Sequence, residues 1–97
     1  MARLNWTTEA ENWVQEIYDY IATDSPRAAK ATAKGIQERV QILRQFPRIG
    51  ARHEPTTDKE VRILLYGHYR IAYVVLSEEE IDIIGVFHGS MDMDRLL

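Results

Sequence analysis

Apolar residues follow two different periods along this chain of 97 residues. Between residues 8 and 46 they recur every three or four positions, which predicts amphipathic helices. After residue 60 they occur in short runs that alternate with other residues and are bounded by turn-forming residues, which predicts strands. The order of the patterns predicts an α+β fold: an N-terminal strand, a helical hairpin, and a three-stranded antiparallel meander forming one sheet packed on the helices.

A short strand at residues 2–6 is predicted to precede the first helix. Thr8 followed by Glu11 is a capping-box pattern, so we expect the helix to begin there and to run for about four turns. One face of this helix is predicted to be buried, because apolar residues recur at helical spacing. These residues are Ala10, Trp13, Val14, Ile17 and Ile21.

Ser25 and Pro26 indicate where a second helix begins, since serine caps helices and proline suits the first helical position. We expect this helix to extend to Phe46. The connection to the first helix is short, which predicts an antiparallel hairpin. Residues 49–60 are rich in glycine, proline, threonine and charged residues and are predicted to form a loop.

The three later strands are predicted to be joined by turns at residues 66–68 and 77–80. A three-residue first turn would pair Leu65 with Tyr69. Period-two alternation then directs one set of apolar side chains toward the helices. This set consists of Val61, Ile63, Leu65, Tyr69, Ile71, Tyr73 and Val75.

The opposite face of the sheet is predicted to stay uncovered. A second three-residue turn would place Arg70 opposite His88 and both on this face, together with Arg62. Charged residues are depleted in strands and costly to bury, so this cationic end invites a functional role. An exposed apolar strip on a small protein usually marks a binding surface. We expect partner binding at Leu64, Ala72, Val74, Ile84 and Val86.

Composition is that of a soluble globular protein with one domain spanning residues 1–97, since 45% of residues are hydrophobic and 28% charged. The absence of cysteine fits a cytoplasmic location. We expect no membrane span or signal peptide, because no apolar run is long enough. The histidines lack metal-ligand spacing, so no metal site and no cofactor are expected. The net charge is −3, although residues 26–53 hold seven basic side chains and one acid, Glu38.

Five segments, in order, resemble the ParE/RelE superfamily of small bacterial toxins, also called plasmid stabilisation proteins. They are the Trp6 region, EIYDYIATDSPRAA (residues 16–29), LRQFPRIG (43–50), YRIAYVV (69–75) and DIIGVFHGSMDM (82–93). The resemblance implies a helical hairpin on an antiparallel sheet and the toxin half of a type II toxin–antitoxin system. It also implies a cognate antitoxin protein that covers the active surface by groove binding or strand addition.

The superfamily divides by target, and three functions follow from the resemblance. The ParE branch poisons DNA gyrase, and the long helical hairpin of this chain resembles that branch. The RNA-cleaving branch is usually strongly basic, whereas this chain has a net charge of −3. A second possibility is a ribosome-dependent mRNA endoribonuclease of the RelE type, acting on the ribosome with its messenger. A third is a decayed, non-toxic member that keeps only the fold and antitoxin binding.

The nuclease alternative would give catalytic roles to Arg62, Arg70, His88 and Glu54. The arginines would stabilise the charge of a phosphorane, and His88 or Glu54 would move the proton of the attacking 2′-hydroxyl. In that group a tyrosine follows the histidine, whereas this chain has Gly89. Whether the chain is an enzyme therefore stays open at the level of sequence. The basic stripe of the second helix is interpreted as a solvated face, with contact to an acidic antitoxin or ribosomal RNA as the alternative.

Overall fold

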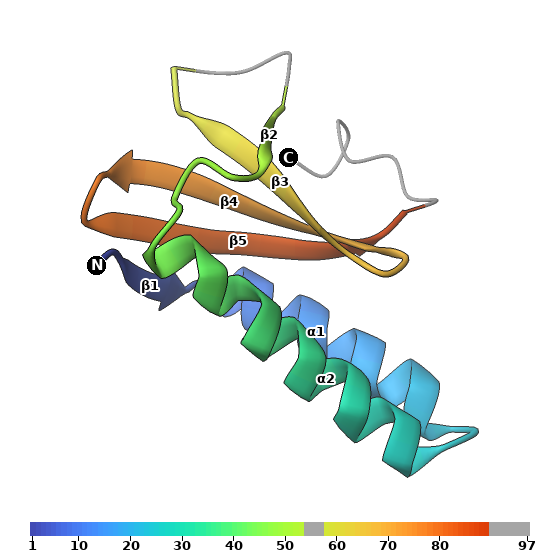
Figure 1. The fold of residues 1–97 in the computed structure, drawn as a ribbon. Helices are drawn as coiled ribbons and strands as arrows, with labels where there is room; N and C mark the ends of the chain where they lie inside the picture. Colours follow the sequence, from blue (N-terminus) through green and yellow to red (C-terminus); the bar gives the residue numbers. More distant parts are fainter. Residues whose placement is uncertain (54–57, 90–97) are drawn as a thin grey trace.

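The computed structural model describes residues 1–53 and 58–89, and in these ranges two α-helices lie on one face of a five-stranded sheet (Figure 1). Helix α1 (Thr8–Ala22) and helix α2 (Pro26–Val40) form an antiparallel hairpin. A 3₁₀ helix, η1 (Gln41–Arg44), directly follows α2. The predicted α+β class is confirmed.

The sheet has the strand order β1-β5-β4-β3-β2. Strand β1 pairs parallel to β5, and all other neighbours are antiparallel. The strands are β1 (Arg3–Trp6), β2 (Ala51–Arg52), β3 (Val61–Tyr66), β4 (Tyr69–Ser77) and β5 (Glu80–His88). Strand β2 was not predicted, because its two residues lie within the polar segment that the sequence indicated to be a loop.

Helix α1 is capped by Thr7, so the predicted cap at Thr8 is wrong by one residue. The Thr7 hydroxyl accepts a hydrogen bond from the backbone N–H of Ala10 at 3.1 Å and donates one to the carbonyl of Ile83 at 2.8 Å. One side chain therefore closes the first turn of the helix and fixes it to β5.

Helix α2 begins as predicted. The Ser25 hydroxyl accepts a hydrogen bond from the backbone N–H of Ala28 at 3.1 Å, and Pro26 occupies the first turn. The helix ends at Val40 rather than Phe46, because the chain tightens into η1. The buried side chains Val40 and Leu43 continue the apolar face across this change.

The turn between β3 and β4 contains only Gly67 and His68, because Tyr66 pairs directly with Tyr69. Gly67 has a φ of 56°, a left-handed conformation that glycine adopts without a steric penalty. The predicted three-residue turn is wrong, and this shift by one residue moves every side chain of β3 to the other face. Leu64 lies in the core, whereas Leu65 is 60% exposed.

The turn between β4 and β5 is also one residue shorter than predicted, since Ser77 pairs with Glu80. His88 consequently pairs with Tyr69 instead of Arg70. Directly opposed residues of two strands share one face of a sheet, and Tyr69 packs against the main core. His88 therefore lies on the helix side of the sheet, opposite to the prediction.

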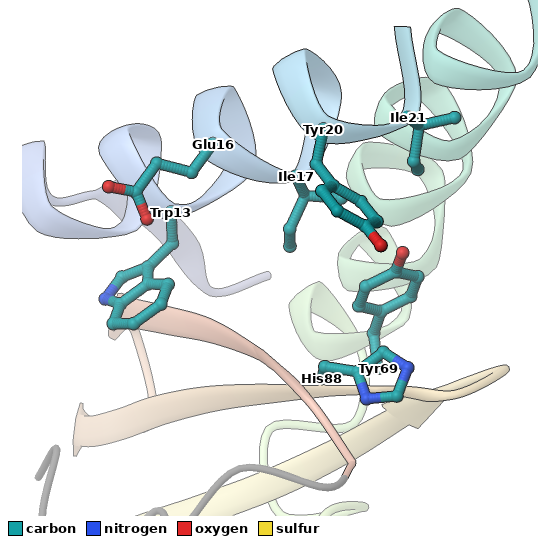
Figure 2. Close-up of a pocket in the computed structure, with 7 residues that line it drawn as sticks. All are labelled: Trp13, Glu16, Ile17, Tyr20, Ile21, Tyr69 and His88. Carbon is teal, nitrogen blue, oxygen red and sulfur yellow. The ribbon is translucent and has the colours of Figure 1, made fainter. Parts of the chain in front are cut away.

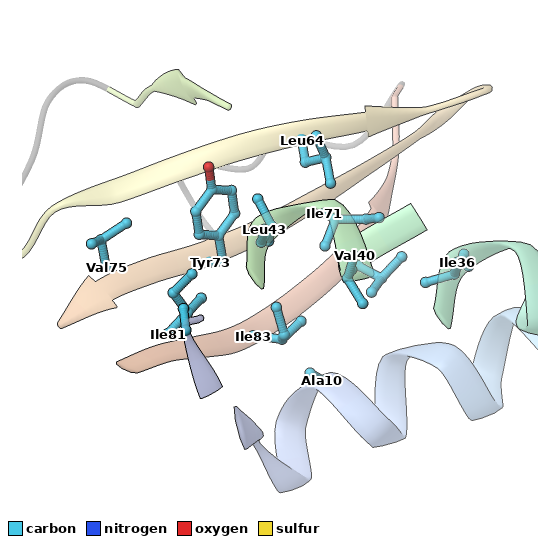
Figure 3. Close-up of a cluster of buried hydrophobic side chains, with 12 residues drawn as sticks. Ala10, Ile36, Val40, Leu43, Leu64, Ile71, Tyr73, Val75, Ile81 and Ile83 are labelled. Atoms are coloured by element: carbon cyan, nitrogen blue, oxygen red, sulfur yellow. The ribbon is translucent and has the colours of Figure 1, made fainter. Parts of the chain in front are cut away.

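The core lies between the sheet and the helical hairpin (Figure 3). The predicted inward set is confirmed for β4, whose residues Ile71, Tyr73 and Val75 are buried there, and wrong for β3. The buried cluster consists of Ala2, Ala10, Ile36, Val40, Leu43, Leu64, Ile71, Tyr73, Val75, Ile81, Ile83 and Val86.

Candidate functional site

A groove opens between α1 and the end of the sheet where β4 begins and β5 ends (Figure 2). Its volume is about 470 Å³. Helix α1 forms one wall, and the sheet supplies the other. The lining residues are Trp13, Glu16, Ile17, Tyr20, Ile21, Tyr69 and His88.

The helical spacing of α1 places its groove residues along one edge of the buried face. Trp13 is held in place by Phe87 of β5, because the two rings pack edge-to-face with 4.8 Å between their centroids. Tyr20, in the last turn of α1, is 81% exposed. The wall is therefore anchored at one end and open to solvent at the other.

The sheet side of the groove is formed by an aromatic pair. The rings of Tyr69 and His88 meet edge-to-face at 5.7 Å, and the ring of His68 stacks on His88 at 6.3 Å. Figure 2 shows the hydroxyls of Tyr20 and Tyr69 directed toward one another across the opening. Aromatic and aliphatic walls with one carboxylate, that of Glu16, suit the apolar side chains of a partner segment.

Sequence reasoning missed this groove because it assigned His88 to the other face. Two features of the sequence together could have indicated the groove, namely an aromatic residue beside the apolar stripe of α1 and an aromatic residue at the start of β4. Tyr20 falls just outside the apolar stripe of α1, while Tyr69 belongs to the inward set of β4. When the apolar stripe of a helix is wider than the area that the sheet covers, part of it stays exposed at the surface.

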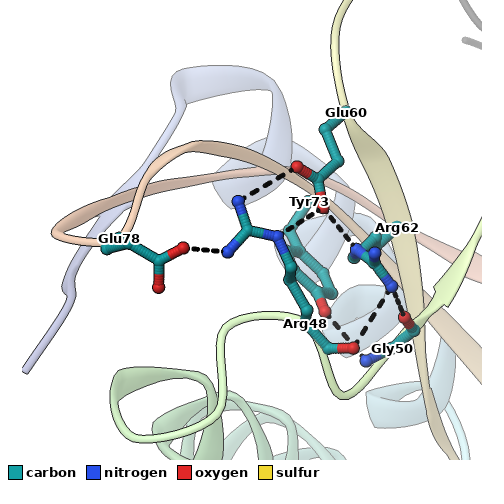
Figure 4. Close-up of polar contacts among 6 residues, drawn as sticks. All are labelled: Arg48, Gly50, Glu60, Arg62, Tyr73 and Glu78. Carbon is teal, nitrogen blue, oxygen red and sulfur yellow. Dashed lines mark hydrogen bonds and ion pairs between the residues drawn. The ribbon is translucent and has the colours of Figure 1, made fainter.

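Arg62 lies at a different place, on β3 opposite Tyr73 (Figure 4). Its guanidinium donates hydrogen bonds to the carbonyls of Arg48 at 3.2 Å and Gly50 at 2.8 Å, and to the Glu60 carboxylate at 2.7 Å. The Tyr73 hydroxyl accepts from the backbone N–H of Gly50 at 2.9 Å. Arg62 thus holds the segment after η1 against the sheet.

Gly50 is required for this contact. A Cβ there would lie 2.7 Å from the carbonyl oxygen of Ile63 and 2.7 Å from the Tyr73 hydroxyl. Only a residue without a side chain allows the backbone to approach so closely. The segment LRQFPRIG, which contributed to the family resemblance, therefore contains two residues, Arg48 and Gly50, that secure the fold.

The charges around Arg62 stabilise one another. The hydrogen bond from Arg62 lowers the pKa of Glu60 below its ordinary value of 4.5, and hydrogen bonds from Arg48 add to this. Hydrogen bonds to Glu78 and Glu60 raise the pKa of Arg48. Burial raises the pKa of Tyr73 above 10.0, against the opposing effect of the Gly50 N–H. All of these groups keep their ordinary neutral-pH charge states, as a structural network requires.

The structure does not bring the predicted catalytic residues together. Arg62 and His88 share the helix side of the sheet, but their partners Tyr73 and Tyr69 lie four residues apart on β4, roughly 13 Å. Arg70 lies on the opposite face and is exposed, with no hydrogen bond or ion pair among the described residues. Their predicted common face is wrong because both turns are shorter by one residue. Glu54 lies outside the described residues.

The predicted partner-binding strip is likewise not a single bare face. Leu64 and Val86 belong to the main core, because β3 and this part of β5 are inverted relative to the prediction. Ala72 is fully buried in a second cluster with Phe87, whose ring also covers Gly85. Val74 is 6% exposed, and only Ile84 is partly exposed.

Residues 1–53 and 58–89 contain neither a metal-binding cluster nor a membrane-spanning helix. No group of three or more histidine, cysteine or carboxylate side chains there has the arrangement of a metal site. Neither helix in these ranges combines the length and apolarity needed to cross a bilayer.

Comparison with known proteins identifies the family. The sequence profile of the ParE toxin of the type II toxin–antitoxin system parDE matches residues 4–93. The chain belongs to the ParE toxin family. A solved structure described as the chromosomal ParDE TA system from P. aeruginosa has 27% sequence identity and a TM-score of 0.74. The match covers 91% of this chain and 96% of that one.

No curated protein matches the chain. Family membership rests on the profile and on the shared fold of the solved ParDE chain. It confirms the predicted membership of the ParE/RelE superfamily and makes the chain a toxin of the type II class. The helical hairpin and all residues that line the groove lie within the region that the profile matches.

Proposed function

We propose that this ParE-family chain inhibits DNA gyrase and that a cognate antitoxin neutralises it. The observation that carries the proposal is the match of the ParE profile to residues 4–93. The similar solved chain comes from a ParDE toxin–antitoxin system, which supports an antitoxin as the partner. The separation of Arg62, Arg70 and His88 favours action by binding over RNA cleavage, because a phosphoryl-transfer site needs its charged groups around one phosphate.

The groove on α1 is the surface best suited to the antitoxin. Trp13, held by Phe87, and the exposed ring of Tyr20 both line the groove, so an amphipathic segment could bury apolar side chains against them. The partner segment would insert apolar side chains beside Ile17 and Tyr69. This contact would also cover His88, which lies at the mouth.

Induced expression in bacteria tests the target. We expect a DNA-damage response and arrested replication, and we expect the purified chain to inhibit plasmid supercoiling by purified gyrase. The double variant Arg70→Ala/His88→Ala should stay toxic, because neither residue takes part in chemistry. Rapid loss of translation with cut transcripts, abolished in that variant, would instead establish the endoribonuclease. Absence of any growth defect would favour the non-toxic alternative.

Binding of the antitoxin encoded by the adjacent reading frame tests the groove. Tyr20→Ala removes an exposed side chain from the rim and should weaken binding about tenfold or more, as truncation of an aromatic anchor does. Phe46→Ala is the matched control, because Phe46 is 56% exposed and does not line the groove. Isothermal titration calorimetry measures both. Equal affinity of the two variants would place the antitoxin elsewhere.

A further inference from the structure

The two helices of the hairpin carry opposite charges. Helix α1 has four acids and no basic residue: Glu9, Glu11, Glu16 and Asp19. Helix α2 has four basic residues and one acid: Arg27, Lys30, Lys34, Arg39 and Glu38. Such separation on adjacent helices differs from the mixed signs of an ordinary solvated surface.

These charges do not neutralise one another within the chain. All four acids of α1 are exposed, as are Arg27, Lys30 and Lys34 on α2. Within the described residues no ion pair joins the two helices, although they lie side by side. Among the residues that the structure describes, Asp19 accepts a hydrogen bond only from Gln15 of its own helix. Both rows of charge are therefore available to a partner.

The geometry of the hairpin places bases of α2 and at least one acid of α1 at the same level along the helices. Arg27, Lys30 and Lys34 follow three- and four-residue spacing and share one face of α2. Asp19 on α1 and Lys30 on α2 lie at similar distances from the turn that joins the helices. Figure 1 shows that this turn projects beyond the sheet, so the end of the hairpin is accessible.

We propose that the hairpin is a self-complementary interface through which two copies of this chain associate. A two-fold axis parallel to the helices places α1 of each copy antiparallel to α2 of the other. Acids then meet bases twice, with Asp19 of one copy beside Arg27 and Lys30 of the second. The exposed Ala28 and Ala31 on α2 present no bulk against this approach.

A second copy fits this surface better than a nucleic acid. Phosphates would be attracted by the basic stripe but repelled by Glu38 within it and by the acids of α1 beside it. The chain as a whole has a net charge of −3, which opposes general affinity for nucleic acid. The same acids are what a second copy of α2 requires.

Sedimentation velocity of the purified full chain over a range of concentrations tests the proposal. We expect reversible dimers at low salt that dissociate as salt screens the exposed pairs. Glu11→Lys/Asp19→Lys and Lys30→Glu/Lys34→Glu should each weaken dimerisation about tenfold or more, because like charges then face one another at the substituted positions. Neither pair of positions lines the groove on α1.

Sedimentation velocity of a mixture of the two variants is the decisive experiment. In the mixed dimer the substituted α1 of one chain faces the substituted α2 of the other, so opposite charges meet again at the changed positions, and the second pair of facing helices keeps its native charges. Association should therefore return to the wild-type strength. Asp58→Lys/Glu79→Lys, which changes the net charge by the same amount outside the helices, should leave dimerisation unchanged. A wild-type chain that stays monomeric, or a mixture that does not reassociate, overturns the interface. Binding of duplex DNA by a monomeric wild type, lost in Lys30→Glu/Lys34→Glu, would assign the stripe to nucleic acid instead.

Discussion

Replacing Arg62 by methionine is expected to destabilise the fold by about 2–3 kcal/mol. Methionine keeps much of the aliphatic length and removes the guanidinium that binds two backbone carbonyls and Glu60. A hydrogen bond contributes about 1 kcal/mol net. The ion pair adds less than about 1 kcal/mol, because the side chains of Arg62 and Glu60 are 18% and 19% exposed and so remain partly screened.

Urea denaturation followed by the fluorescence of Trp6 and Trp13 measures the loss. The midpoint should fall by about 1–2 M with an unchanged slope. Arg70→Met is the matched control, and its free energy of unfolding should stay within about 0.5 kcal/mol of the wild type. Arg70 is exposed and makes no hydrogen bond within the described part of the chain. Equal effects of the two substitutions would refute the structural role assigned to Arg62.

Two further predictions concern the same region. Gly50→Ala should lower the free energy of unfolding by about 2 kcal/mol or more, because the added Cβ would press on the backbone. Gly67→Ala should lower it by about 1 kcal/mol, since only the left-handed φ of 56° is unfavourable there. Thermal unfolding measures which variant is less stable, and a less stable Gly67→Ala would contradict the prediction. Glu60→Gln should cost most near neutral pH. The lowered pKa of Glu60 contributes stability above its ordinary value of 4.5 that is lost as pH falls through the lower folded value. A difference from wild type that stays constant down to about pH 3 would exclude this linkage.

Local signals in the sequence were sufficient for the presence and order of the two helices and for the fold class, although not for the end of α2. Ser25 and Pro26 act within one turn of their own position, so the start of α2 could be predicted to the residue. The inward set of β4 was also correct, because alternation within a strand needs no knowledge of its neighbours.

The faces of β3 and β5 depended on turn lengths that composition does not fix. Gly67 suits both a two-residue and a three-residue turn, and one residue of difference inverts β3. The position of His88 depended on the second turn, because the two pairing irregularities near Ala72 and Val75 cancel before Tyr69 is reached. The role of Arg62 was hidden for another reason, since two of its acceptors are backbone carbonyls, which every residue type provides.

The parallel pairing of β1 with β5 ties the order of synthesis to the order of folding. Asn5 of β1 is made before β5 and finds its partners only when Glu80 and Asp82 have been made. Contacts so remote in sequence form late, because a long loop must close first. A nascent chain that terminates before β5 lacks the strand that joins β1 to β4. It also lacks the carbonyl of Ile83, to which Thr7 donates a hydrogen bond. We therefore expect premature termination to give a fragment without the native fold instead of a smaller toxin.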